Sequence, residues 1–138
     1  MPRLSLLAPL ALAMCSAAAI AAPNDADAIL GQWQGTSLCT NREVAPSCKD
    51  EKTRYAFTRG SEGKIRCAAD KLVGGEFAPM GELDFDYVPA ERRWTCELKT
   101  AGSHAVWSFA VDGDRLTGTL VDVPTGAQTR KVSAARTK

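Results

Sequence analysis

The chain has 138 residues, of which 17 are Lys or Arg and 16 are Asp or Glu, so its formal net charge is +1 at pH 7. A chain of this length forms one domain around one hydrophobic core. A nucleic-acid-binding domain usually carries an excess of basic residues on one face. The near-neutral balance therefore argues against nucleic acid as a partner.

Residues 1–21 have the layout of a cleaved secretory signal. A short basic start at Arg3 precedes an apolar run over residues 4–14, and an alanine-rich region ends in Ala-Ile-Ala at residues 19–21. That tripeptide matches an A-x-A cleavage site. The apolar run is shorter than the roughly 20 residues of a transmembrane helix. We expect a periplasmic or secreted protein with no transmembrane segment, and a single domain over residues 22–138.

A lipoprotein signal is the alternative for this leader. Leu12-Ala13-Met14-Cys15 resembles the box in which a bacterial lipoprotein cysteine is acylated and becomes the mature N-terminus. Met14 departs from that pattern, which has a small residue before the cysteine. We therefore expect Cys15 to be removed with the signal.

Four cysteines follow the leader: Cys39, Cys48, Cys67 and Cys96. An even number of cysteines in a small exported domain most simply forms disulfides. Of the three possible pairings, Cys39 with Cys48 is the local choice, and Cys67 with Cys96 then remains. Zinc is the alternative, but the sequence has no C-x-x-C and its only histidine, His104, lies far from the local pair. We expect two disulfides, no metal and no cofactor.

From Gly31 onward, apolar and polar residues alternate in short runs that end at glycine, proline or other turn-forming residues. Asp112-Gly113 is the strongest two-residue hairpin signal among these turns. Short runs with a turn about every 8 to 12 residues are typical of a β-sandwich or a β-barrel. We expect residues 74–81, which contain three glycines and a proline, to form a long loop over one barrel mouth. The eight runs cover residues 31–40, 53–59, 64–73, 82–88, 93–100, 104–111, 115–123 and 129–135.

Antiparallel strands in so short a chain leave edges that invite self-association unless the sheet closes. We therefore expect an all-β fold, an eight-stranded antiparallel up-and-down barrel. Such a barrel has room for packed side chains or for one small ligand. The residues expected to face inward are Trp33, Tyr55, Phe57, Ile65, Leu83, Phe85, Tyr87, Trp94, Leu98, Trp107, Phe109, Leu116 and Leu120.

The first run opens with Gly31-x-Trp33-x-Gly35. This motif, on the first strand of an eight-strand pattern, resembles the opening motif of lipocalins and the wider calycin group. The resemblance covers the mature chain in pattern but only a few residues in identity. It implies that Trp33 closes one barrel end and that an arginine of the last strand, here Arg130 with Lys131 as the alternative, lies across the indole. Short bacterial lipocalin-like proteins and small barrel inhibitors of secreted metalloproteases fit this length better than typical lipocalins.

One strand carries a row of carboxylates that is a candidate for metal binding or acid–base chemistry. Glu82, Asp84 and Asp86 alternate with apolar residues, so they share the face opposite the core. Cross-strand ion pairs on a solvated face, with Arg93 and Lys99 of the next run, account for them. We therefore assign no chemistry to this row.

No catalytic constellation is evident elsewhere. General acid–base catalysis by His104 would require a nucleophile and an orienting group within reach, and the turn in which we place this residue provides neither. We therefore expect a protein that is not an enzyme.

Three functions fit these features, the third being a structural component of the cell envelope that has no ligand. The first is a lipocalin-like protein that binds a small apolar ligand inside the barrel. The alternative is a protein-binding module, such as an inhibitor of a secreted or periplasmic hydrolase, which meets its partner through the loop over residues 40–52 or the N-terminal arm over residues 23–29. The residues expected to line the ligand site are Tyr55, Phe57, Phe85, Tyr87, Trp107 and Phe109.

Overall fold

A computed structural model describes residues 25–138, so the expected signal over residues 1–21 and Cys15 lie outside the described residues. The described chain opens with a 3₁₀ turn, η1 (Asp25–Ile29), and no helix in it is long and apolar enough to cross a membrane. The strands that follow are β1 (Gly31–Cys39), β2 (Glu51–Arg59), β3 (Ile65–Val73), β4 (Glu76–Val88), β5 (Arg93–Thr100), β6 (Ser103–Asp112), β7 (Arg115–Asp122) and β8 (Gln128–Arg136).

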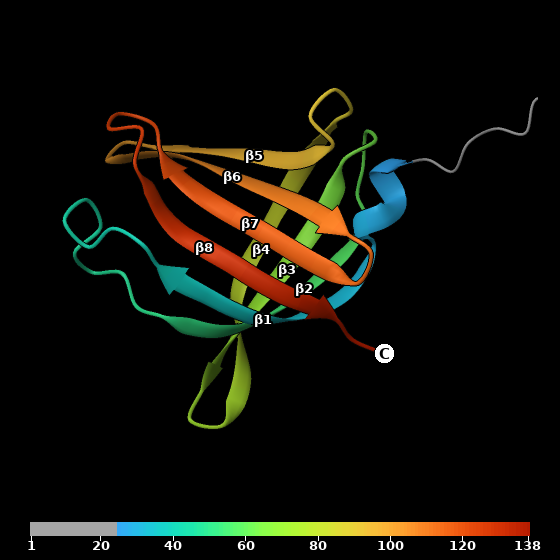
Figure 1. Ribbon diagram of the computed structural model, residues 1–138, viewed down its shortest axis with the longest axis horizontal. Coiled ribbons are helices and arrows are strands. Elements are labelled where there is room, and N and C mark those ends of the chain that lie inside the picture. The colour runs from blue at the N-terminus through green and yellow to red at the C-terminus, as the bar shows by residue number, and fades with distance from the viewer. Residues whose placement is uncertain (1–24) are drawn as a thin grey trace, which may run out of the picture.

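The eight strands form one closed barrel (Figure 1). Each strand pairs antiparallel with its neighbours in sequence, and β8 returns to pair with β1. This seam is tight at Gly35, where any Cβ atom would collide with the backbone of Ser133 and Ala134. The expected all-β, up-and-down barrel is confirmed, and the second glycine of the opening motif is required for its closure.

The strand boundaries agree with the sequence pattern within about two residues, except at β4, which begins at Glu76 and not at residue 82. The long loop expected over residues 74–81 is therefore wrong. Gly74 and Gly75 have φ angles of 58° and 86° and form the tight turn of a hairpin in which Val73 pairs with Glu76. Two adjacent residues with positive φ suit a two-residue hairpin turn. The β3–β4 hairpin projects beyond the barrel wall (Figure 1).

β4 and β5 are joined over only three residue pairs, from Asp86–Thr95 to Val88–Arg93. The other neighbouring strands pair over seven to nine residues. The two strands diverge before Asp86 in β4 and after Thr95 in β5. In Figure 1, β5 runs along the top of the barrel and β4 runs toward the projecting hairpin. The barrel wall is therefore parted on this side, at the end that carries the β3–β4 hairpin.

The core is built around aromatic rings that meet edge to face. The Phe109 ring lies 5.6 Å from Phe57 and 5.4 Å from Phe85, measured between centroids, at interplanar angles of 79° and 61°. All the expected inward residues except Leu120 belong to this core or pack against it. Five further residues belong to the core: Ile29, Cys67, Cys96, Val132 and Ala134.

The row of carboxylates at residues 82, 84 and 86 of β4 forms ion pairs with Arg66 of β3 and with Lys64, the residue before β3, and not with β5. Arg66 donates to Asp84 at 3.0 Å, and Lys64 to Asp86 at 2.8 Å. The β3–β4 register places Arg66 opposite Asp84, whereas β5 leaves β4 beyond Asp86. The hydrogen bond from Arg66 lowers the pKa of Asp84. The expected ion pairs between these carboxylates and two basic residues of β5, Arg93 and Lys99, are therefore wrong.

We predict that Phe57→Ala lowers the free energy of unfolding by about 3 to 5 kcal/mol, because Phe57 is 2% exposed and its removal leaves a cavity among packed rings. Urea denaturation followed by tryptophan fluorescence measures this change. Leu72→Ala, at an exposed position of the hairpin, is the matched control and should change stability by no more than about 0.5 kcal/mol. Equal losses in the two variants would contradict the assignment of the core.

Candidate ligand-binding cavity

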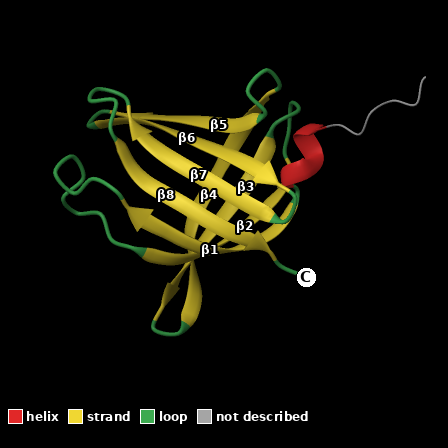
Figure 2. Ribbon diagram, viewed as in Figure 1, coloured by secondary structure: helices red, strands yellow, loops and turns green. Residues whose placement is uncertain are grey.

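One end of the barrel is closed by η1, the red turn in Figure 2. Its backbone carbonyls accept hydrogen bonds from the indoles of the barrel: Trp33 Nε1 donates to Ile29 O at 2.9 Å, and Trp94 Nε1 to Ala26 O at 3.0 Å. Ile29 and Trp33 are fully buried. The turn is therefore fixed to the barrel by buried groups and seals this end.

Arg136, and not Arg130, lies over the indole of Trp33. Its guanidinium carbon is 4.2 Å from the ring centroid. Nη1 of Arg136 donates to Leu30 O at 2.7 Å, and Nη2 donates to Ala28 O at 2.8 Å. The assignment of Arg130 to the plug is wrong because the β1–β8 register places Arg136 directly opposite Trp33 and Arg130 opposite Cys39, at the other end of the barrel. The resemblance predicts an arginine on the correct face of β8 but at the wrong position along the strand.

The opposite end holds a cavity of about 460 Å³. This volume lies in the range of about 300 to 1,000 Å³ that is usual for small-molecule sites. Four of the six residues that the sequence analysis names as candidates for a ligand site line this cavity: Tyr55, Phe85, Trp107 and Phe109. The other lining residues are Ser37, Glu51, Cys67, Ala69, Met80, Gly81, Glu82, Leu83 and Arg130.

The two remaining candidates lie elsewhere. Phe57 is enclosed by other aromatic rings of the core, with its centroid 6.4 Å from that of Tyr55. Tyr87 lies beside Trp94 at a centroid separation of 4.8 Å. Both are inward-facing, as expected, but neither lines the cavity, because the pattern gives the face of a strand and not the depth along the barrel axis.

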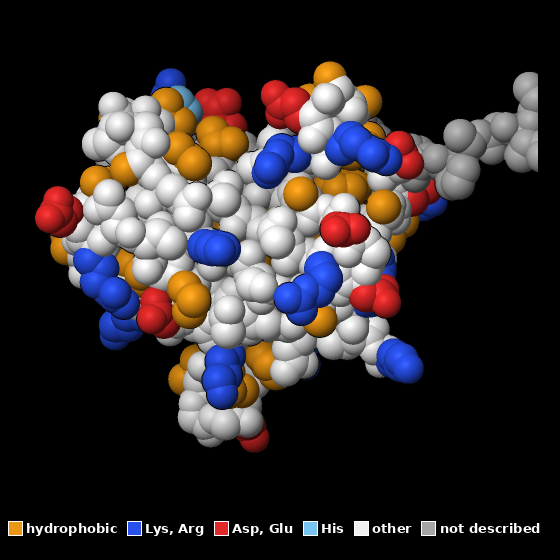
Figure 3. All heavy atoms as spheres, viewed as in Figure 1, with side chains coloured by type: hydrophobic (Ala, Val, Ile, Leu, Met, Phe, Trp, Pro, Cys, Tyr) orange, Lys and Arg blue, Asp and Glu red, His pale blue; other side chains and the backbone are white. Residues whose placement is uncertain are grey.

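The cavity meets solvent where β4 departs from β5. Met80, Gly81 and Glu82 of β4 are exposed and also line the cavity, so they form its rim. Met80 continues into the projecting hairpin, where Leu72 and Val73 are exposed as well. Figure 3 shows hydrophobic side chains gathered on this hairpin, at the bottom of the view. An exposed apolar surface on the hairpin therefore lies next to the cavity mouth.

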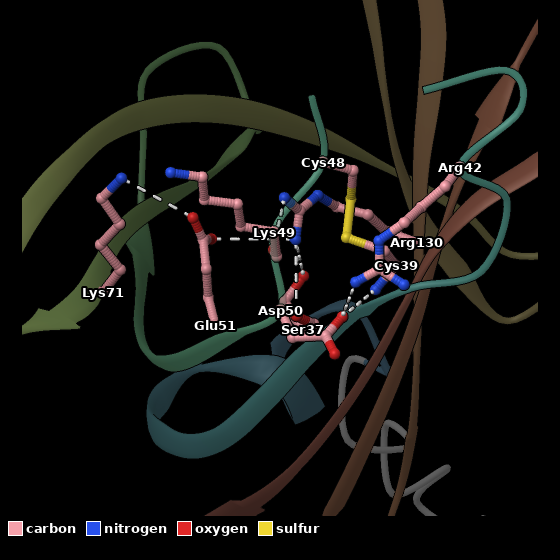
Figure 4. Close-up of polar contacts among 9 residues, drawn as sticks. All are labelled: Ser37, Cys39, Arg42, Cys48, Lys49, Asp50, Glu51, Lys71 and Arg130. Atoms are coloured by element: carbon pink, nitrogen blue, oxygen red, sulfur yellow. Dashed lines mark hydrogen bonds and ion pairs between the residues drawn. A yellow bond between two sulfur atoms is a disulfide. The ribbon is translucent and has the colours of Figure 1, made fainter. Parts of the chain in front are cut away.

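A group of polar side chains lies at the other side of the cavity, beside the disulfide loop (Figure 4). Arg130 Nη1 donates to Ser37 Oγ at 3.0 Å, and Nη2 donates to Lys49 O at 3.0 Å. Glu51 lies between two cations, with one carboxylate oxygen 3.8 Å from Arg130 and the other 3.7 Å from Lys71 Nζ. The side chains of Arg130 and Glu51 are only 17% and 19% exposed, so this end of the cavity is polar but largely shielded from water.

Tyr55 lies at the boundary between the polar and apolar parts. Burial raises the pKa of its phenol to about 12, while the hydroxyls of Thr53 and Ser37 and the charge of Arg130 act in the opposite direction. The phenol is therefore neutral at physiological pH. A neutral phenol can both donate and accept a hydrogen bond.

The cysteines form one disulfide, not two. Cys39 and Cys48 are bonded, as expected. Cys67 and Cys96 are free and buried, so the second expected disulfide is wrong. They lie on β3 and β5 with β4 between them, which separates their backbones by roughly 9 to 10 Å. This separation exceeds the roughly 4.4 to 6.8 Å between Cα atoms that a disulfide usually spans.

We predict that the chain following the expected cleavage site has two thiols that do not react in the native state. Although Cys67 lines the cavity, it is only 4% exposed and burial raises the pKa of its thiol to about 12, and Cys96 is buried as well, so a thiol reagent at pH 8 should modify neither. Unfolding in guanidinium without reductant should expose two thiols, and reduction should raise the number to four. Finding none in the unfolded, unreduced chain would show that Cys67 and Cys96 are bonded.

His104 is the second residue of β6, so it belongs to the strand expected from residue 104 and not to the turn before it. Its Nε2 lies 2.6 Å from Glu97 Oε1 on the outer surface, away from the cavity lining. Over residues 25–138, no group of three or more His, Cys, Asp or Glu side chains is placed to hold a metal ion.

The sequence matches no protein-family model, and comparison with curated proteins finds no match. The architecture is an eight-stranded antiparallel barrel with strands in up-and-down order, which is consistent with a calycin-like fold.

Proposed function

We propose that this protein is an exported, lipocalin-like barrel that binds a small apolar or amphipathic molecule in its cavity. The observation that carries the proposal is the cavity itself, about 460 Å³ with mainly apolar walls and a few convergent polar groups. Small-molecule sites commonly have this composition. The disulfide between Cys39 and Cys48 supports export, since such bonds persist in oxidising compartments.

The division of the barrel into a sealed end and an open end supports the same proposal. The aromatic core and the plug stabilise the fold, so the residues around the cavity need not fill it. Trp107 is only half-buried, although it belongs to the inward face of β6 and stacks on Phe109 at 5.7 Å. A large aromatic surface left partly exposed inside a barrel is available to a ligand.

The test is a cavity-filling variant. Ala69 faces the cavity opposite Gly81, so Ala69→Phe should place a ring in the space that the ligand would occupy. We predict that the mature protein binds the neutral apolar dye N-phenyl-1-naphthylamine at one saturable site. Ala69→Phe should weaken this binding at least about tenfold, a change of about 1.4 kcal/mol. Titration of dye fluorescence measures the affinity.

Ala68→Phe is the matched control, because Ala68 is the preceding residue of β3 and faces the opposite side of the sheet. It should bind the dye as the unmodified protein does, and both variants should unfold cooperatively in urea. The proposal fails if the unmodified protein does not bind the dye, or if the two substitutions affect binding equally.

A further inference from the structure

We infer that the ligand of this cavity carries an anionic group, of the carboxylate type, which Arg130 binds while the apolar part of the ligand packs on Trp107 and Phe109. This inference rests on the proposed function and specifies the class of ligand. An amphipathic monocarboxylate is the simplest molecule with these two features.

The strand register places the two binding elements at a suitable separation. Trp107 lies opposite Leu120 across the β6–β7 ladder, and Leu120 lies opposite Arg130 across the β7–β8 ladder. The three residues thus form one row across neighbouring strands, and the outer two are separated by roughly 9 to 10 Å at the backbone. Both Trp107 and Arg130 line the cavity. One small molecule can therefore contact the indole with its apolar part and the guanidinium with its polar end.

Arg130 has hydrogen-bond donors to spare. A guanidinium has five N–H groups. Those of Nη1 and Nη2 donate to Ser37 and to the carbonyl of Lys49, and Nε makes no hydrogen bond to any residue in the described range. The protein contacts hold the guanidinium at the cavity wall without using all of its donors. Charge-assisted hydrogen bonds to a carboxylate are stronger than bonds between neutral groups.

Arg136 provides the contrast within the same strand. It lies six residues from Arg130 on the same face of β8, yet all three of its nitrogens are engaged. Nη1 and Nη2 donate to the carbonyls of Leu30 and Ala28, and Nε lies 3.3 Å from Asp114. Arg136 is committed to the plug, whereas Arg130 faces a cavity.

Among the described residues that line the cavity, Arg130 is the cation. Two carboxylates also line the cavity, and each is held by a cation outside the lining: Glu51 by Lys71 at 3.7 Å and Glu82 by Arg66 at 3.4 Å. Glu51 is shared between Lys71 and Arg130, which lies 3.8 Å away, so the protein neutralises the Arg130 guanidinium only in part. An anionic group is therefore the complement that Arg130 offers a ligand.

The experiment compares three probes of equal chain length, decanoate, decanol and decylamine, by titration calorimetry with the mature protein. We expect decanoate to bind at least about tenfold more tightly than decanol, and decylamine to bind most weakly. Arg130→Gln should weaken decanoate binding by about 10- to 100-fold and change decanol binding by less than about twofold. Arg136→Gln is the matched control and should keep the ratio of decanoate to decanol affinity.

The outcomes separate this inference from the proposed function. If decanol binds as tightly as decanoate, if Arg130→Gln keeps the affinity ratio, or if the neutral dye binds and decanoate does not, the role of Arg130 is overturned and the apolar site stands. If none of the three probes and no dye binds, both this inference and the proposed function fail.

Should Arg130→Gln not fold, Glu51→Gln replaces it. Removing the competing carboxylate should tighten decanoate binding several-fold, and unchanged or weaker binding would overturn the inference.

Discussion

The hydrogen bonds between a short 3₁₀ turn and the side chains of the barrel end are the interactions on which the rest of this structure depends. A single turn cannot satisfy its own carbonyl groups, and each one buried without a donor would cost about 1 to 3 kcal/mol. Trp33, Trp94 and Arg136 provide the donors and bury the turn at the same time. Because this end is closed by such specific contacts, the other end can remain open without loss of the fold.

The opening has a definite origin in the sheet. Seven of the eight strand interfaces are long ladders, while β4 and β5 separate after three residue pairs. The ion pairs of Arg66 and Lys64 tie β4 to β3, and the bulge near Ala69 shifts the β3–β4 register just where the rim residues begin. The cavity mouth is thus a consequence of strand pairing and does not require a separate loop or lid.

The fold could be predicted from the sequence because alternation along a strand reports directly which side chains face inward. Position along the barrel axis is not encoded in that alternation. Arg130 and Arg136 have the same parity on β8, and only the register with β1 decides which of them meets Trp33. The same limit explains why alternation along the strand places Phe57 in the candidate site although it lies deeper in the core. Pairing Cys67 with Cys96 by elimination fails because the intervening strand keeps the two cysteines apart.

The β1–β8 seam has a consequence for how the chain folds. Every other ladder joins strands that are consecutive in sequence, but this one brings Trp33 against Arg136, at the two ends of the described chain. Contacts between residues so distant in sequence carry a larger loop-closure entropy and form late in folding. The plug is completed by the same pair, so the barrel end can be sealed only after the last strand is in place. A chain cut short before β8 would lack both its seam and its plug, and would expose the unpaired edges of β1 and β7 to other copies.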